Sequence, residues 1–316
     1  MRIIALEEHV LPKEISAELG AVAPTWPQKA SDLLDELDGK RLESMDSAGI
    51  DVQVLSIVGH PIQELEPHRS VALSRKANDR VAAAVAAHPD RFAAFATLPM
   101  SDPPAAAAEL RRAVADLGFV GAMIHGQTNG LFLDDLAFVP LLAEAQELGV
   151  PIYLHPAEPP PVVRRAYFSG LKPVAAEYLS RGSWGWHAEL GLHVLRLAVG
   201  GTFERFPALQ IIVGHMGEHL PFNLARADEK LSPVTGLPRS VAETVRDQVH
   251  ITTSGYTTNP PLLCALLVFG ADRILFSVDY PFSDNAEATA FLNSAPISPA
   301  DREKIGHANC ERLLKL

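Results

Sequence analysis

The chain begins with the stretch Ile3-Ile4-Ala5-Leu6-Glu7-Glu8-His9, an apolar run that leads directly into two acidic residues and a histidine. Short, β-branched apolar runs of this kind recur along the 316 residues and alternate with longer amphipathic stretches. This alternation is typical of βα units built around a parallel sheet. It predicts eight strands, at residues 3–6, 52–57, 92–97, 121–124, 151–154, 209–213, 249–252 and 274–277.

Helical patterns lie between these strands, most clearly at 71–87, 104–117, 138–148, 188–200 and 260–269. Eight strands with intervening helices predict a (β/α)8 barrel, an α/β fold of the TIM type, while an open doubly wound sheet also fits the pattern. The composition does not break at any point, so we expect residues 1–316 to form a single domain. Two connections, 21–29 and 156–187, are long, and we expect them to be ordered binding loops at the C-terminal ends of strands.

The charge balance argues against two classes of partner. The chain has 27 Lys and Arg against 38 Asp and Glu, a net charge of −11, whereas nucleic acid and anionic membranes require a basic face. No apolar run reaches the roughly 18 residues of a membrane helix, and the acidic residues after position 6 do not fit an export signal. The two cysteines, Cys264 and Cys310, fit a reducing compartment and exclude a thiolate metal cluster. We therefore expect a cytoplasmic protein with a small-molecule substrate.

Histidine and acidic residues follow several of the predicted strands. Glu7 and His9 leave the first strand, His155 the fifth, His215 the sixth and Asp279 the eighth. In a barrel, residues just beyond the strands point to one shared mouth, and residues two apart on an extended strand face the same side. Nitrogen and oxygen donors without a thiolate suit one Zn²⁺ ion, with Mn²⁺ as the alternative. A Glu-x-His pair alone is a weak signal, so the metal site is predicted from the convergence of several strand ends.

Four motifs carry a resemblance to a known family. They are Ala5-Leu6-Glu7-Glu8-His9, Leu154-His155-Pro156, Gly214-His215-Met216-Gly217-Glu218 and Phe276-Ser277-Val278-Asp279-Tyr280-Pro281-Phe282. Together they resemble the amidohydrolase superfamily. Within it, they look like the branch of non-oxidative aromatic acid decarboxylases, which includes the γ-resorcylate and 2,3-dihydroxybenzoate decarboxylases. The resemblance extends over nearly the whole chain.

The resemblance implies a metal-dependent decarboxylase that acts on a small hydroxylated aromatic carboxylic acid. It implies a divalent metal held by Glu7, His9, His155 and Asp279, with His215 close by. Asp279 would deliver a proton to the ring carbon that bears the carboxylate, and His215 would act as proton relay or base. A positioned acid can protonate carbon in this way when a metal neutralises and orients the phenolic substrate.

Two further residues match the branch. Glu218 would fix the tautomer of His215. Arg226, on the following helix, would hold a substrate carboxylate, or would pair with Glu229 or Glu218 as a structural ion pair. The resemblance also suggests a homodimer or a homotetramer.

Two histidines depart from the branch. His125 follows the fourth strand, where the decarboxylases have Asn, and His60 follows the second strand. Each is expected either to face the pocket, where it would change what reacts there, or to be an ordinary surface or core histidine. Four aromatic residues are candidates to wall an aromatic ring, with ordinary packing as the alternative: Trp26, Trp184, Trp186 and Phe282.

Two other functions stay open on the sequence alone. A metal-dependent hydrolase or hydratase of the same superfamily would act on an ester, lactone or unsaturated acid, with His215 or Asp279 as the base for an activated water. The third hypothesis is a barrel that has kept the metal-ligating residues but acts as a binding or accessory protein without catalysis. His187 and His193 are expected to be structural. The sequence does not identify the aromatic acid or the native metal.

Overall fold

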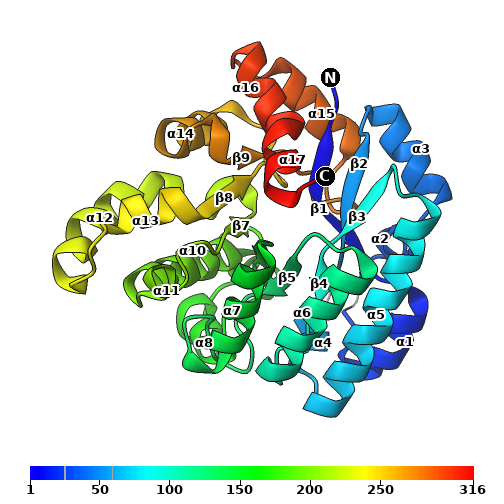
Figure 1. Ribbon diagram of the computed structural model, residues 1–316, viewed down its shortest axis with the longest axis horizontal. Coiled ribbons are helices and arrows are strands. Elements are labelled where there is room, and N and C mark those ends of the chain that lie inside the picture. The colour runs from blue at the N-terminus through cyan, green and yellow to red at the C-terminus, as the bar shows by residue number, and fades with distance from the viewer. Residues whose placement is uncertain (25, 59) are drawn as a thin grey trace.

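The computed structural model describes residues 1–316 except 25 and 59. Strands occupy the centre of the molecule and helices surround them (Figure 1). The strands of the described residues are β1 Ile4–Val10, β2 Val52–Ile57, β3 Phe92–Ala94, β4 Ala96–Thr97, β5 Ala122–His125, β6 Ile152–His155, β7 Ile211–Val213, β8 Val249–Thr252 and β9 Ile274–Leu275. All eight predicted strands are present, although β1 continues to Val10 rather than ending at residue 6.

The strands pair in parallel, in two sheets with the orders β1-β2-β3 and β4-β5-β6-β7-β8-β9. Neighbours in space are neighbours in sequence throughout, whereas a doubly wound sheet reverses its strand order at a switch point. β3 and β4 are two halves of the predicted third strand, and Phe95 between them donates its N–H to Leu55 O at 2.9 Å. At the other seam, His9 N–H donates to Tyr280 O at 2.7 Å, which joins β1 to the segment after β9. The chain is therefore a (β/α)8 barrel, as predicted.

The helices begin and end at residues that favour these positions. Proline stands in the first turn of α5, α6, α7 and α14, where its missing N–H costs no helical hydrogen bond. The helices of the described residues are α1 Lys13–Leu19, α2 Gln28–Asp35, α3 Gly39–Ala48, α4 His60–Glu64, α5 Pro67–Ala87, α6 Pro103–Leu117, α7 Val139–Leu148, α8 Pro161–Phe168, α9 Pro173–Ser180, α10 Gly185–Val199, α11 Thr202–Arg205, α12 Leu220–Thr235, α13 Val241–Gln248, α14 Asn259–Phe269, α15 Asn285–Ser294, α16 Pro299–Glu303 and α17 Asn309–Leu314. All five predicted helices are present.

The two long connections were predicted to be loops, but they contain helical segments. Residues 156–187 contain α8, α9 and the start of α10, and residues 21–29 overlap a short 3-10 turn and the start of α2. Prolines at 161 and 173 begin α8 and α9, so the Pro-rich composition that suggested a loop marks helix starts instead. Residue 25 of the first connection lies outside the described residues.

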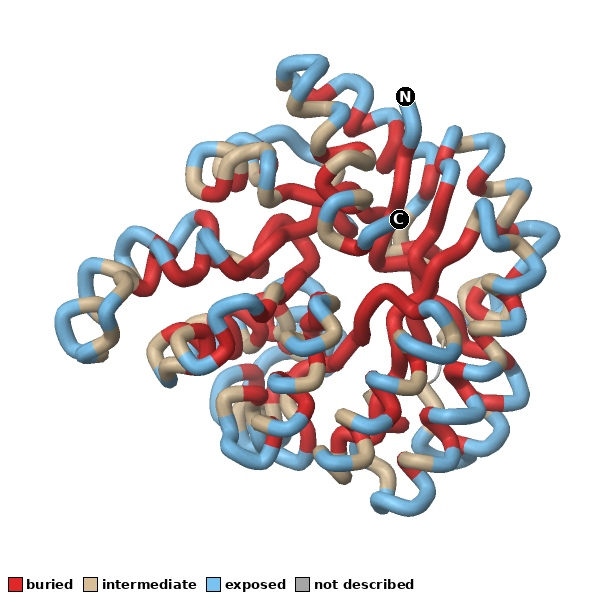
Figure 2. The backbone as a smooth tube through the Cα atoms, in the orientation of Figure 1, coloured by how far each residue is buried: buried red, intermediate tan, exposed pale blue. Residues whose placement is uncertain are grey.

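The core has two layers, because each strand is buried on both faces. Figure 2 shows the central strands buried throughout and the exposed positions confined to the outer helices and loops. Ile4, Leu6, Phe95 and Tyr153 belong to an inner cluster, while Ala5 belongs to a larger cluster that packs with the helices. Strands covered on both sides read as continuous apolar runs, which is why they were visible in the sequence.

A bulge in β1 decides which of its polar residues face the barrel mouth. Ala5 pairs with Gln53 and Glu8 pairs with Leu55, so β1 has one residue more than β2 over this stretch. An extra residue reverses the alternation of side chains. Glu7 and His9 therefore lie on the inner side, while Glu8 lies on the side of Gln53.

His193 on α10 predicts how the stability of the fold depends on pH. Its Nε2 accepts the Leu133 N–H at 2.9 Å, and burial lowers the pKa of His193 to about 3. The unfolded chain binds a proton at this side chain below pH ~6.5, and the folded chain does so only near pH 3. The free energy of unfolding should therefore fall as the pH falls from about 6.5 to about 3.

The His193→Gln protein should lose less stability over that range, because an amide oxygen still accepts the Leu133 N–H but does not titrate. Urea unfolding of both proteins at neutral and mildly acidic pH measures the difference. An equal loss in the two proteins would contradict this prediction.

In the described part of the chain, no helix combines the length and the apolar character needed to cross a membrane.

Candidate active site

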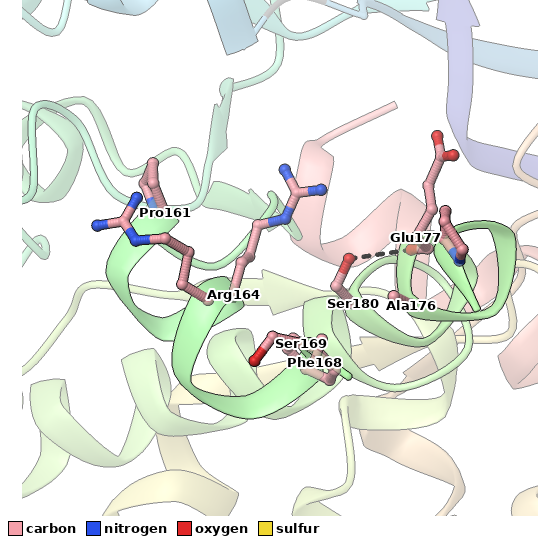
Figure 3. Close-up of a pocket in the computed structure, with 9 residues that line it drawn as sticks. Pro161, Arg164, Phe168, Ser169, Ala176, Glu177 and Ser180 are labelled. Atoms are coloured by element: carbon pink, nitrogen blue, oxygen red, sulfur yellow. Dashed lines mark hydrogen bonds between the residues drawn. The ribbon is translucent and has the colours of Figure 1, made fainter. Parts of the chain in front are cut away.

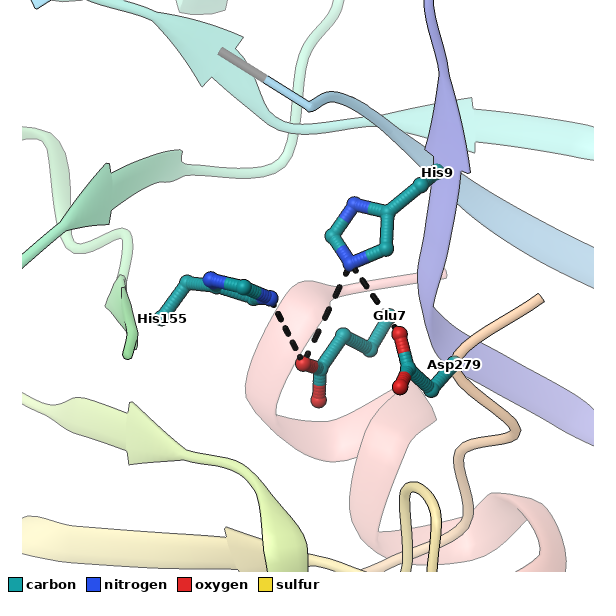
Figure 4. Close-up of side chains that lie close together, drawn as sticks. All are labelled: Glu7, His9, His155 and Asp279. Atoms are coloured by element: carbon teal, nitrogen blue, oxygen red, sulfur yellow. Dashed lines mark ion pairs between the residues drawn. The ribbon is translucent and has the colours of Figure 1, made fainter. Parts of the chain in front are cut away.

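Four side chains from three parts of the barrel meet at its mouth (Figure 4). Glu7 and His9 come from β1, His155 ends β6, and Asp279 follows β9. Each offers one ligand atom, and these four atoms lie within 4.8 Å of one another. His155 Nε2 is 3.2 Å from Glu7 Oε1, and His9 Nε2 is 3.3 Å from Asp279 Oδ1. The structure thus brings together the four residues that the sequence analysis assigned to one metal.

The cluster fits a divalent cation. Glu7 Oε1 and His9 Nε2 are buried and have no hydrogen-bond partner among the described residues, although buried polar atoms are nearly always paired. His155 Nδ1 is 2.7 Å from Pro156 O, so this nitrogen carries the hydrogen and Nε2 presents a lone pair to the cluster. Two imidazole nitrogens and two carboxylate oxygens are a donor set that Zn²⁺ and Mn²⁺ accept.

The surroundings keep Glu7 ionised. Burial alone would raise the pKa of Glu7, but the nearby His215, His155 and His9 rings hold it well below its usual range. The Tyr153 hydroxyl donates to the other oxygen of the same carboxylate. Burial and the charge of Glu7 raise the pKa of Tyr153 well above its ordinary value, so this phenol stays a donor. A fully buried carboxylate with an orphaned oxygen is suited to charge compensation by a cation.

A second cluster lies beside the first and contains His187, His215 and Glu218. The two oxygens of Glu218 are each 2.6 Å from Nδ1 of one of these rings. His215 Nε2 then faces the first cluster, 3.8 Å from both Glu7 Oε1 and Asp279 Oδ2. Glu218 thus contacts Nδ1 of His215, which is the contact needed for the expected role of fixing the tautomer of this ring.

Electrostatics within this second cluster favour charged groups. Burial alone would raise the pKa of Glu218, but His215 and His187 lower it to about 2. Burial alone would lower the pKa of His215, but the carboxylates of Glu7 and Glu218 raise it well above its usual value. His215 is thus an imidazole that holds a proton close to Asp279.

His187 was expected to be structural, and its two ring nitrogens make contacts within the protein. Its Nε2 is 2.8 Å from Gly182 O and its Nδ1 faces Glu218, so both nitrogens face acceptors. The sequence held no signal for its contact with Glu218, because His187 lies in the first turn of α10 and only the folded chain brings the two residues together.

A cavity of about 550 Å³ opens beside the metal-binding cluster. His155 is shared by the cluster and the cavity wall, and Trp26, His60 and His125 also line it. Burial and the neighbouring His155 lower the pKa of His125 well below its ordinary value, so this ring is neutral. Both departures from the decarboxylase pattern, at 60 and 125, therefore face the cavity.

The aromatic candidates differ in position. Trp26 lines the cavity and its ring lies 4.7 Å from that of Phe282, which is 5.8 Å from the ring of His9. Trp186 also lines the cavity. Trp184 is more than half exposed and packs on His219, so it does not wall the site.

Arg226 lies elsewhere, which corrects one alternative of the sequence analysis. Its guanidinium on α12 is 69% exposed and pairs with Glu229 at 3.1 Å. The structural ion pair, rather than a contact with a substrate carboxylate, is what this chain shows. Arg181 was not predicted, and it lines the cavity mouth, where it pairs with Glu158 and Glu177.

A second cavity of about 490 Å³ lies between α8 and α9 (Figure 3). It shares Glu177 with the first cavity but includes none of the metal-binding cluster. Two arginines line it: Arg164 is partly buried and paired with Glu158, and Arg165 is exposed. The metal-binding cluster therefore adjoins the first cavity and not the second.

The fold and the site define a member of the amidohydrolase family. The model of that family matches residues 8–316, so the chain belongs to it. The chain is 39% identical to the γ-resorcylate decarboxylase of Rhizobium sp. (strain MTP-10005) over 326 aligned positions, which cover 99% of this chain and 98% of that protein.

Two solved structures place the fold among aromatic acid decarboxylases. One is a 2,6-dihydroxybenzoate decarboxylase complexed with 2,6-dihydroxybenzoate, with a TM-score of 0.90 and 38% identity over 100% of both chains. The other is a dihydroxybenzoic acid decarboxylase from Polaromonas sp. JS666 with bound manganese and the inhibitor 2-nitroresorcinol. It has a TM-score of 0.91 and 36% identity over 100% of this chain and 97% of that chain. The resemblance to the decarboxylase branch is confirmed.

Proposed function

We propose that this protein is a metal-dependent, non-oxidative decarboxylase of a small hydroxylated aromatic carboxylic acid. The observation that carries the proposal is the four-residue cluster with orphaned ligand atoms beside a cavity lined by aromatic and imidazole rings. Full-length similarity to dihydroxybenzoate decarboxylases supports it.

Glu7, His9, His155 and Asp279 would hold one divalent cation. When bound, this cation supplies positive charge that neutralises and orients the carboxylate and the ortho-hydroxyl of a phenolic acid. Zn²⁺ and Mn²⁺ both fit the donor set, and the manganese in the Polaromonas relative supports the second.

Asp279 would deliver the proton to the ring carbon that bears the carboxylate. Its side chain is 17% exposed, against 10% for His155 and full burial for Glu7 and His9, so it is the most exposed of the four clustered side chains. The carbon–carboxylate bond then breaks, and its electron pair restores the aromatic ring as carbon dioxide leaves. His215, with Nε2 3.8 Å from Asp279 Oδ2, would return a proton to Asp279 through a short movement.

The cavity walls would select the ring. Trp26 offers an apolar face in the cavity wall, and aromatic contacts stabilise a bound aromatic acid. Phe282 packs on Trp26 and on His9 and lies outside the set of residues that line the cavity. His60 and His125 would contact substituents of the substrate ring. We also propose that the protein works as a homodimer or homotetramer, following the resemblance to its branch.

Carbon dioxide release tests the proposal directly. The metal-loaded protein should convert 2,6-dihydroxybenzoate or a related phenolic acid to the phenol and carbon dioxide in equal amounts, without oxygen or an organic cofactor. Esters, lactones and unsaturated acids assayed in ¹⁸O-labelled water provide the comparison. Incorporation of the label without carbon dioxide release would assign the protein to the hydrolases or hydratases instead.

The Tyr153→Phe substitution should weaken metal binding. It removes the hydroxyl that donates to Glu7 and that lies 3.1 Å from Thr252 Oγ1, so one oxygen of a buried carboxylate loses its donor. Loss of such a contact behind a metal ligand typically costs about 10- to 100-fold in affinity. Competition with a chromophoric chelator measures the dissociation constant for Mn²⁺ or Zn²⁺.

Tyr178→Phe is the matched control, because Tyr178 is 68% exposed on α9. Its metal affinity should equal that of the unmodified protein. An unchanged affinity in Tyr153→Phe would contradict the prediction.

A further inference from the structure

The carboxylate of Glu8 holds the main chain on both sides of Asp279. Its Oε1 accepts the Val278 N–H at 3.0 Å, and its Oε2 accepts the Tyr280 N–H at 3.3 Å. One buried side chain on β1 therefore fixes the residues before and after Asp279 across 270 positions of sequence.

The backbone of Asp279 needs such support. Its φ is +74°, in the left-handed region that residues other than glycine seldom adopt. A conformation of this kind persists only where the surrounding structure determines it. The Asp279 carboxylate lies 3.3 Å from His9 Nε2 and 3.8 Å from His215 Nε2, so releasing the flanking bonds would move the group that the proposed function makes the proton donor.

Glu8 is in turn held by a series of buried polar side chains. Gln53 Nε2 donates to Glu8 Oε2 at 3.2 Å, and Gln53 Oε1 accepts from Arg41 Nη1 at 3.0 Å. Arg41 Nη2 donates to His9 O at 2.6 Å, and its guanidinium lies 4.7 Å from the centre of the Tyr280 ring. One network of Glu8, Gln53 and Arg41 thus contacts the main chain at His9 and on both sides of Asp279. His9 and Asp279 are two of the four clustered residues.

The position of this network follows from the bulge in β1. The bulge turns Glu8 away from the barrel mouth, where Glu7 and His9 lie, and toward Gln53. Glu8 is completely buried and touches neither the cavity nor the ligand atoms. Burial raises the pKa of Glu8 to about 8, because burying a carboxylate is costly unless hydrogen bonds compensate it. The compensating bonds come from the Val278 and Tyr280 N–H groups and from Gln53, which are all donors and so favour the charged form.

We propose that Glu8 is a positioning residue for Asp279: supported by Gln53 and Arg41, it fixes the backbone at 278 and 280 so that the Asp279 carboxylate meets both the cation and the substrate. The inference rests on the proposed function for its catalytic consequence, and on the geometry alone for its effect on the metal site.

Glu8→Gln is the decisive variant, because an amide of nearly the same shape offers one acceptor oxygen where the carboxylate offers two. One of the two flanking N–H groups then faces an N–H donor. We expect kcat to fall about 10- to 100-fold, KM to change less than threefold, and the visible absorption spectrum of the Co²⁺-loaded protein to change because Asp279 is displaced.

Glu109→Gln is the matched control. Glu109 is also a buried glutamate, but it binds Asn78 and Arg112 on the outer side of the barrel, away from the cluster. Its substitution should reduce thermal stability while leaving kcat and the Co²⁺ spectrum unchanged. A loss of kcat and an altered spectrum in Glu8→Gln alone would support the proposal.

The proposal is overturned if a folded Glu8→Gln protein keeps the kcat and the Co²⁺ spectrum of the unmodified protein. If Glu8→Gln does not fold, Gln53→Leu decides, because it removes the side-chain donor to Glu8: a lower kcat with unchanged KM supports the proposal, and an unchanged kcat overturns it. If the unmodified protein releases no carbon dioxide, the proposed function fails, and the Co²⁺ spectra of these variants still decide the role of Glu8.

Discussion

The Asp279→Asn protein is expected to lose nearly all decarboxylase activity while it still binds metal. Asparagine keeps one oxygen that can face the cation near His9, where Asp279 Oδ1 lies 3.3 Å from Nε2, but it has no acidic proton to deliver to carbon. General acid catalysis contributes about 10²- to 10⁴-fold, so kcat should fall by roughly that amount. Carbon dioxide release measures the rate, and elemental analysis of the purified protein measures the metal content.

Asp284→Asn is the control for this substitution. Asp284 lies five positions further along the chain, where it caps α15 by accepting the Glu287 N–H at 2.9 Å, and it does not belong to the cluster. Its kcat should stay close to that of the unmodified protein. A kcat of Asp279→Asn within a few-fold of the original would remove Asp279 from the role of proton donor.

Removal of the metal is expected to abolish activity and to lower stability. Without a cation, Glu7 and Asp279 bring two carboxylates to the same mouth, and the orphaned Glu7 Oε1 and His9 Nε2 stay unpaired. A cation present at 100 times its dissociation constant stabilises the folded state by about 2.7 kcal/mol. Dialysis against a chelator should therefore reduce carbon dioxide release to background and lower the Tm by several degrees.

Re-addition of single metals completes this experiment. Mn²⁺ or Zn²⁺ should restore both activity and Tm, whereas Mg²⁺ should restore little, because imidazole nitrogen is a poor ligand for it. Full activity in a protein shown by elemental analysis to be free of metal would contradict the proposed mechanism.

The positions of the clustered residues were predictable for a specific reason. Each of Glu7, His9, His155 and Asp279 follows a short apolar run, and strands buried on both faces are visible as such runs. Parallel strands of a barrel end at the same rim. Local sequence therefore sufficed to predict that these residues and His215 converge on one mouth, whereas the choice of four of them as metal ligands came from the family resemblance.

Other parts of the site were beyond local reasoning. Tyr153 lies inside an apolar strand and looked like core, yet its hydroxyl reaches Glu7. Glu8 reads as one more acid beside Glu7, and the bulge decides which of these two neighbours faces the barrel mouth. Arg226 fitted a motif by its spacing, but its side chain points to solvent and pairs with Glu229, because spacing along a helix does not determine which face meets the cavity.

Sequence alone determined that this chain alternates strands with helices, and which acidic and imidazole side chains follow its strands. The strand order of the tertiary structure decided for a barrel over an open doubly wound sheet. Strand periodicity is a local property, so it can be read residue by residue. Only the tertiary structure decided that Glu218 joins His187 to His215, and that Glu8, Gln53 and Arg41 support the segment of Asp279. These contacts join segments that are far apart along the chain, and their geometry depends on one extra residue in β1 and on the packing of the whole barrel.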